Sequence, residues 1–158
     1  MPSNLIRKII FFWKRPKIIV VTDGNLQSIK KIAAQILNSS LKVEKEVLFV
    51  NDVENENFYK KEYLIFNLDR GSVRKTKEMS DVKVLTFGFQ EGADLQASDL
   101  RQNGGTNFKI NYQGKIIPIW LGPSDREEIY SVLTAVAIGV VLGLNLVEIS
   151  QTLTPVTK

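Results

Sequence analysis

The sequence contains no cysteine and no histidine among its 158 residues. Without cysteine there can be no disulfide framework, thiol nucleophile or zinc–thiolate site, and such a composition fits a reducing compartment such as the cytoplasm. Without histidine, Ser-His-Asp catalysis and the common zinc enzymes are excluded, because both use imidazole. Any general base or metal ligand must therefore be Asp, Glu, Lys or Tyr.

A strong excess of one charge is also missing. The 21 Lys and Arg residues are scattered among 17 Asp and Glu residues, which leaves a net charge of +4. A mild and dispersed positive charge does not favour a nucleic-acid partner, and none is predicted. The length and the 44% hydrophobic content are typical of one compact domain with a single core.

Two apolar segments raise the question of membrane contact. Residues 129–146 are almost uncharged and match the ~18–20 residues that span a bilayer. Because the run contains Tyr130, Ser131 and Thr134 and follows an α/β pattern, we predict a buried core helix instead. Residues 5–15 place apolar and aromatic side chains between basic ones. This segment could lie on a membrane surface, but packing on the domain or on a partner is the favoured interpretation. We therefore expect a basic and aromatic segment at 1–15 and a single domain at 16–158.

The first half of the chain follows a strand–helix–strand pattern. Residues 17–22 form a continuous apolar run, typical of a central parallel strand covered on both faces. Apolar residues then recur from Ile29 to Leu37 with the spacing of one helix face, and Asn38 is a plausible stop. Further short strands are predicted at residues 47–50, 63–68 and 82–87. A β-α-β beginning indicates a parallel or mixed sheet.

The second half predicts a hairpin followed by helices. Alternating apolar residues at 108, 110 and 112, a turn at Gln113-Gly114 and a run at 116–121 indicate two antiparallel strands. Ser124 and Glu127 have the spacing of a capping box for a long apolar helix that ends near Leu144. A short helix is expected at 146–153. The predicted fold class is α/β, with a three-layer, mixed and mainly parallel sheet, a β-hairpin and a long C-terminal core helix.

Four short motifs then occur in a recognisable order. Residues 84–88 read Val-Leu-Thr-Phe-Gly, 93–95 read Ala-Asp-Leu, 105–108 read Gly-Thr-Asn-Phe, and a later helix ends in Leu-Gly-Leu at 142–144. This series resembles the later half of the Mur ligase central domain. Residues 15–22 are similar to the strand before the ATP-binding loop in the branch of that family that adds D-Ala-D-Ala. The resemblance covers most of residues 15–158 and includes neither the UDP-sugar domain nor the C-terminal domain of the family.

The resemblance places a degenerate phosphate loop at Thr22, Gly24, Asn25 and Ser28. The family's loop contains a Lys and a second Gly that are missing here, and Asp23 adds a negative charge. The alternative interpretation, which we favour, is a simple turn in which Asn25 caps the next helix.

Other family features also differ. The family's magnesium-binding Glu aligns with Asn67, and its His-Asn pair aligns with Glu127-Glu128, which we interpret as favourable charges at a helix N-terminus. Between Leu68 and Val82, only a short charged segment replaces the family's active-site helices. No catalytic residue and no metal ligand are therefore assigned.

These departures predict a Mur-ligase-like domain that has lost ATP binding and catalysis. It would act as an interaction module for a protein partner or a homo-oligomer, or be a remnant. The alternative is an ATP-dependent amide ligase of peptidoglycan precursor synthesis, active with other domains or chains, with ATP and magnesium as cofactors.

Overall fold

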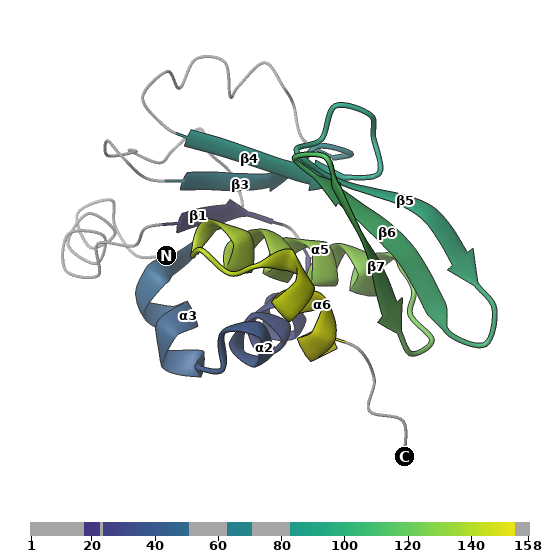
Figure 1. Cartoon of the computed structure of the whole chain (residues 1–158). Helices are drawn as coiled ribbons and strands as arrows, with labels where there is room; N and C mark the ends of the chain where they lie inside the picture. The colour runs from purple at the N-terminus through teal and green to yellow at the C-terminus, as the bar shows by residue number, and fades with distance from the viewer. Residues whose placement is uncertain (1–17, 23, 51–62, 71–82, 154–158) are drawn as a thin grey trace.

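The computed structural model describes residues 18–22, 24–50, 63–70 and 83–153, which include one seven-stranded sheet (Figure 1). The strand order is β2-β1-β3-β4-β5-β6-β7. Strands β2, β1, β3, β4 and β5 pair in parallel, whereas β6 and β7 are antiparallel additions. The strands are β1 (Ile18–Val21), β2 (Val47–Val50), β3 (Tyr63–Asn67), β4 (Lys83–Gly88), β5 (Leu95–Gln102), β6 (Thr106–Tyr112) and β7 (Lys115–Leu121). The α/β class, the mixed and mainly parallel sheet and the hairpin are confirmed.

Strand β1 is central because it is apolar on both faces. Ile18 and Val20 belong to the main core, while Ile19 lies on the opposite face with Leu64 and Phe66. All five side chains are buried. The continuous apolar run in the sequence therefore has the expected cause, since a strand covered on both faces has no solvent side to fill with polar residues.

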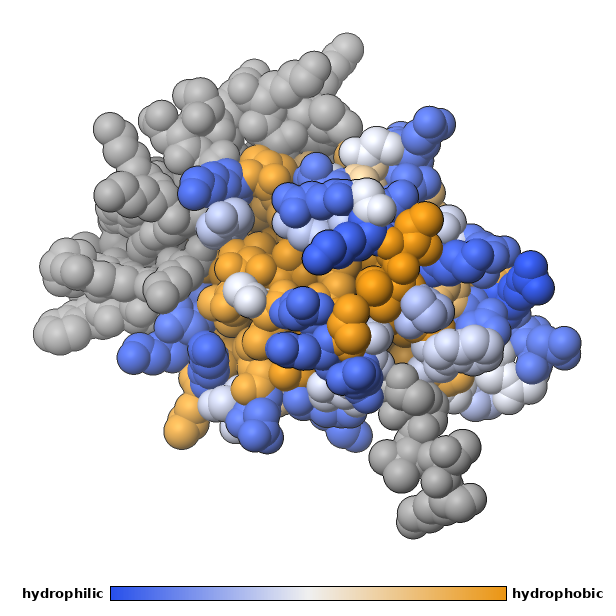
Figure 2. Space-filling view, in the orientation of Figure 1, coloured by the Kyte–Doolittle hydropathy of each residue, from blue (hydrophilic) through white to orange (hydrophobic). Residues whose placement is uncertain are grey.

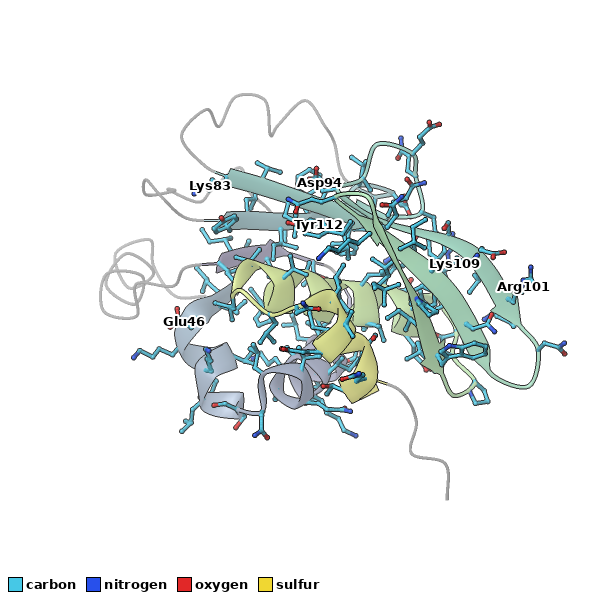
Figure 3. All side chains as sticks on the ribbon, in the orientation of Figure 1. Glu46, Lys83, Asp94, Arg101, Lys109 and Tyr112 are labelled. Atoms are coloured by element: carbon cyan, nitrogen blue, oxygen red, sulfur yellow. The ribbon has the colours of Figure 1, made fainter. Side chains whose placement is uncertain are left out.

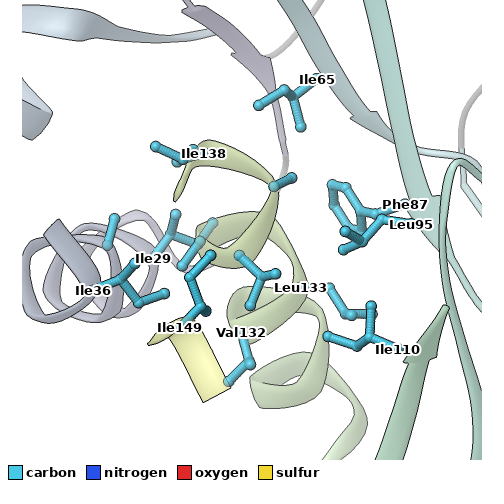
Figure 4. Close-up of a cluster of buried hydrophobic side chains, with 14 of the residues drawn as sticks. Ile29, Ile36, Ile65, Phe87, Leu95, Ile110, Val132, Leu133, Ile138 and Ile149 are labelled. Carbon is cyan, nitrogen blue, oxygen red and sulfur yellow. The ribbon is translucent and has the colours of Figure 1, made fainter. Parts of the chain in front are cut away.

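The described helices lie together against one face of the sheet (Figure 1). They are α2 (Leu26–Leu37), α3 (Ser40–Glu46), α5 (Arg126–Val141) and α6 (Leu146–Leu153). In α5, every residue from Ile129 to Gly139 is buried, and a helix that is apolar all round must be buried. Figure 4 shows Leu133 and Ile138 of this helix among side chains from α2 and the sheet. No described helix is long and apolar enough to cross a membrane, and the core-helix prediction is confirmed.

Two elements were missed by sequence reasoning. Helix α3 begins at Ser40, two residues after Asn38, which ends α2 in the left-handed conformation. Ser39, between them, caps α3 by accepting a hydrogen bond from Lys42 N. Strand β5 is mostly polar, and only two of its side chains are buried. It begins next to Asp94, whose Oδ2 accepts hydrogen bonds from Thr86 N (2.9 Å) and Thr86 Oγ1 (3.1 Å) of β4 (Figure 3).

The predicted start and end of the long helix were wrong. Asp125, not Ser124, caps α5, because Asp125 Oδ1 accepts from Glu128 N at 2.8 Å. The Ser124 hydroxyl instead donates to Gly122 O at 2.9 Å. At the other end, α5 stops at Val141, shortly before Gly143 takes a φ of +92°. The predicted segment at 1–15 lies outside the described residues, so the proposed domain boundaries stay a prediction.

Candidate functional site

A pocket lies where the strand order changes direction. The chain runs from β1 to β2 on one side, whereas β3 pairs with the other side of β1. In parallel α/β sheets, such a switch leaves a crevice beyond the carboxyl ends of the strands, where ligands bind. Here the crevice has a volume of about 170 Å³. Its lining comes from the ends of β1, β3 and β4 and from the starts of α2 and α5, and comprises Val21, Thr22, Gly24, Ile29, Phe66, Asn67, Arg70, Phe87, Glu127, Tyr130, Ser131 and Thr134.

Three residues of the predicted phosphate loop, Thr22, Gly24 and Asn25, occupy the turn before α2, and the fourth, Ser28, lies in the first turn of that helix. Thr22 and Gly24 line the pocket, and Gly24 N donates to Thr22 Oγ1 at 2.9 Å. Asn25 caps α2 by accepting from Ser28 N at 3.1 Å. The alternative interpretation of Asn25 as a helix cap is thus confirmed. Two amides that could face an anion at this helix start are already bonded to side chains of the turn itself.

Lys30, the nearest downstream lysine in α2, is engaged elsewhere. Its Nζ lies 5.6 Å from the centre of the Phe49 ring on β2, a cation–π distance. Among the residues that line the pocket, Arg70 is the single cation.

Arg70 forms a bidentate ion pair with Glu127 at the rim of the pocket. The hydrogen bonds from Arg70 are the main reason that the pKa of Glu127 is lowered. Arg70 also lies 4.7 Å from the centre of the Tyr130 ring. The pair joins the turn after β3 to the first turn of α5, residues that sequence reasoning treated separately. The sequence predicts Glu127 as part of a capping box and as a favourable charge at a helix start, and it does not indicate the partner 57 residues away.

Aromatic and cationic side chains extend this contact away from the pocket. The Phe89 and Tyr130 rings meet edge to face, with centroids 6.1 Å apart. The guanidinium of Arg126 lies 3.9 Å from the Phe89 ring centre and 5.6 Å from that of Tyr130. Cation–π stacking of this kind fixes the loop after β4 against the start of α5.

Asp69 connects the loop after β4 to Tyr130 of α5 through hydrogen bonds. Its Oδ2 accepts from Phe89 N (2.8 Å) and Tyr130 Oη (2.7 Å), and its Oδ1 accepts from Gln90 N (2.8 Å). Burial raises the pKa of Asp69, but these hydrogen bonds and the nearby Arg126 outweigh it, so the pKa is lowered. Burial and the hydrogen bond to Asp69 raise the pKa of Tyr130. The carboxylate thus has internal donors on both oxygens, as expected for a structural residue.

Gly88 makes room for this carboxylate. Its φ is +151°, and a Cβ at that position would lie 2.6 Å from Asp69 Oδ1. Asn67, which aligns with the family's magnesium-binding Glu, accepts from Asp69 N at 2.9 Å through its Oδ1. Across the described ranges, no three acidic side chains gather in a group that could hold a metal ion.

Two hydroxyl side chains of α5 face the pocket, and sequence reasoning gave neither a role. Thr134 is 2% exposed and donates to Tyr130 O at 2.7 Å. Ser131 is 4% exposed, yet among the described residues no hydrogen-bond partner for it is found. The available signal was the three-residue spacing of two hydroxyls inside an otherwise apolar helix.

Comparisons with known proteins point in one direction. No family model matches the chain. The UDP-N-acetylmuramate–L-alanine ligase of Persephonella marina is 31% identical over 88 residues, which are 55% of this chain and 18% of the relative. The UDP-N-acetylmuramoyl-L-alanyl-D-glutamate–2,6-diaminopimelate ligase of Halalkalibacterium halodurans is 29% identical over 98 residues, or 61% of this chain and 20% of that enzyme.

A similar fold occurs in a solved ligase structure. It is the UDP-N-acetylmuramoylalanyl-D-glutamyl-2,6-diaminopimelate–D-alanyl-D-alanyl ligase of Acinetobacter baumannii, with a TM-score of 0.67 and 13% identity. The similarity covers 90% of this chain and 46% of that one. The chain therefore spans less than half the length of that ligase, and the curated matches cover a smaller share of their enzymes.

Proposed function

We propose, from the premise that the chain is a distant homologue of the Mur ligases, that its pocket no longer binds ATP and that it acts as an interaction module. The observation that carries this proposal is the closed turn before α2. Gly24 N and Ser28 N donate to Thr22 Oγ1 and Asn25 Oδ1. A phosphate at a helix start is held by such amides, and these two would have to break their bonds to bind one.

The charges around the pocket support the same conclusion. Phosphoryl groups are stabilised by cations positioned around them, whereas Arg70 is paired with Glu127. A phosphate that recruited Arg70 would meet the carboxylate of Glu127 as well, since both residues line the pocket. The resemblance places Asn67 at the magnesium position, and an amide is a weaker ligand for magnesium than a carboxylate.

An exposed apolar column on β7 supports the role as an interaction module. Ile116 and Trp120 are 60% and 54% exposed, and Pro118 lies between them on the same face, since Ile119 points into the core. Figure 2 shows patches of apolar surface among hydrophilic ones on the face of the molecule that is turned to the viewer. Exposed apolar groups of this kind mark contact sites for proteins, so we propose a protein partner or a second copy of the chain.

The edge of β7 is built against strand addition. The two-residue turn at 113–114 makes Tyr112 and Lys115 a hydrogen-bonded pair, so the backbones of residues 116, 118 and 120 face outward from the sheet. Pro118 has no N–H to offer there, which is a common protection of edge strands. Exposed basic side chains come from the two preceding strands, Arg101 of β5 and Lys109 of β6, which are labelled in Figure 3; both form ion pairs with Asp99. Contact through side chains is therefore favoured over pairing of strands.

The test of lost ATP binding is calorimetric titration of the chain with magnesium-ATP. A complete L-alanine-adding ligase in the same buffer serves as the positive control. We expect no saturable heat with the chain up to millimolar nucleotide. Magnesium-dependent binding in the micromolar range would overturn the proposal. Glu127→Gln is the matched variant, because it removes the carboxylate from the pocket and leaves the turn before α2 unchanged.

The alternative function is ATP-dependent amide ligation, which would require other domains or chains. Homology alone supports it, and the two curated relatives come from branches that differ from the D-Ala-D-Ala-adding branch suggested by residues 15–22. Phosphate release on incubation with magnesium-ATP, UDP-N-acetylmuramate and L-alanine tests it for the first of those branches. We propose a cytoplasmic location with either function.

A further inference from the structure

The pocket contains a buried hydroxyl that has no hydrogen-bond partner in the described part of the chain. Ser131 lines the pocket, is 4% exposed and has no hydrogen-bond partner within the described parts of the chain. Buried polar groups nearly always have a partner, because leaving one without costs free energy. Thr134 illustrates the usual solution, since it is equally buried in the same helix and donates to Tyr130 O at 2.7 Å. The buried hydroxyl of Ser131 therefore indicates that the pocket binds a molecule with a hydrogen-bonding group.

The other walls define the chemistry of that group. The lining is apolar where Val21, Ile29, Phe66 and Phe87 contribute, and uncharged and polar at Thr22 and Asn67. Among the described lining residues two are charged, Arg70 and Glu127, and they are paired with each other. A charged ligand would lose its hydration without gaining an unpaired opposite charge, which is unfavourable in a buried site.

We propose that this pocket binds a small uncharged ligand in which a hydroxyl or amide oxygen adjoins a short hydrocarbon, and that Ser131 is its main polar contact. The volume of about 170 Å³ is below the ~300–1,000 Å³ of sites for drug-sized molecules, which limits the ligand to a short chain. The inference rests on the proposed function in one respect, namely that no nucleotide occupies the crevice.

The test is an NMR titration of the ¹⁵N-labelled chain with propane-1,2-diol and, separately, with N-methylacetamide. We expect saturable shifts at the amides of Thr22, Gly24 and Ser131. Sodium acetate, an anion of similar size, should give no saturable shift there. Ser131→Ala should weaken binding about three- to tenfold, the loss expected for one neutral hydrogen bond. Ser98→Ala, a change on the exposed face of β5, should leave binding unchanged.

Several results would overturn the inference. Absence of saturable shifts with both uncharged probes would mean that water alone satisfies Ser131. Equal binding by Ser131→Ala, or tighter binding of acetate, would contradict the assigned contact or the assigned class. If Ser131→Ala fails to fold, Ser131→Thr keeps the hydroxyl and must retain binding. Magnesium-ATP is titrated as a separate arm: saturable shifts with ATP defeat the proposed loss of nucleotide binding, whereas the diol and amide arms decide the present inference alone.

Discussion

Replacing Ser131 with alanine should stabilise the ligand-free chain. An unsatisfied buried hydroxyl costs ~1–3 kcal/mol, and alanine is also the better helix former, by up to about 0.5 kcal/mol. The small void left by one oxygen removes roughly 0.5 kcal/mol. The net gain is about 0.5–3 kcal/mol. For a domain of this length, that corresponds to a rise in Tm of roughly 1–12 °C.

Urea unfolding followed by far-UV circular dichroism measures this gain, provided that the m-value is unchanged. Thr134→Val is the matched control, because its hydroxyl donates to Tyr130 O. That variant should lose about 1 kcal/mol. If Ser131→Ala leaves the unfolding midpoint unchanged or lowers it, the hydroxyl is satisfied in solution and the reasoning about the pocket fails.

Three further predictions concern the supports of the site and the edge of the sheet. Asp69→Asn should cost about 1–2 kcal/mol at pH 7, because an amide cannot accept from all three donors and the group is partly exposed. Asp99→Asn is the control, because Asp99 lies at the surface and its ion pairs are screened by solvent; it should leave the urea midpoint unchanged. The pKa of Asp69 is lowered from its usual value of 3.8 by folding. The stability that the carboxylate contributes is therefore complete above pH 3.8 and is lost as the pH falls below that value. The unfolding midpoints at pH 7 and pH 3 should consequently differ less in Asp69→Asn than in the parent chain. Gly88→Ala should cost ~2–4 kcal/mol from backbone strain plus overlap with Asp69, while Gly92→Ala, which meets nothing within 4 Å, should cost about 1–2 kcal/mol in the same urea assay. Pro118→Thr restores an outward N–H on β7 and should increase self-association in concentration-dependent light scattering. A mass equal to that of the parent chain at every concentration would argue against the edge assignment.

Regular periodicity explains what could be predicted of the fold. The run at β1 and the alternation at β6 reflect burial of two faces and of one face. Strand β5 carries no such signal, since most of its side chains are polar. Its pairing with β4 is supported by the hydrogen bonds between Asp94 and Thr86. These contacts are tertiary and leave no period in the sequence.

The error at the start of α5 has a similar origin. Ser124 and Asp125 are both good helix caps, and local sequence does not choose between them. Tertiary contacts hold Ser124 outside the helix: its N donates to Thr106 Oγ1 at 3.1 Å, and its O accepts from Gln102 Nε2 at 2.7 Å. Asp125 is left as the cap. The hydroxyl of Thr106, which belongs to the Gly-Thr-Asn-Phe motif at 105–108, therefore has a structural role in placing the start of α5.

The position of the pocket could be expected from the β-α-β pattern, whereas its chemistry could not. A switch in strand order produces the crevice whichever side chains line it. The ion pair of Arg70 with Glu127 depends on residues 57 positions apart. That Ser131 finds no partner among the described residues depends on the packing of a whole helix. Pattern and spacing contain neither fact.

The closed turn before α2 leads to a last prediction about regaining nucleotide binding. By the family's loop pattern, Gln27 stands where the phosphate-binding Lys would be and Leu26 where the second Gly would be. Gln27→Lys adds the missing cation, and Leu26→Gly restores the missing glycine, but Asn25 still accepts from Ser28 N and Arg70 stays paired with Glu127. We therefore expect the double variant to show no micromolar binding of magnesium-ATP by calorimetry. Detectable binding by the double variant would mean that the missing lysine and glycine alone account for the loss, because the bonds that close the turn would then have yielded to the phosphate.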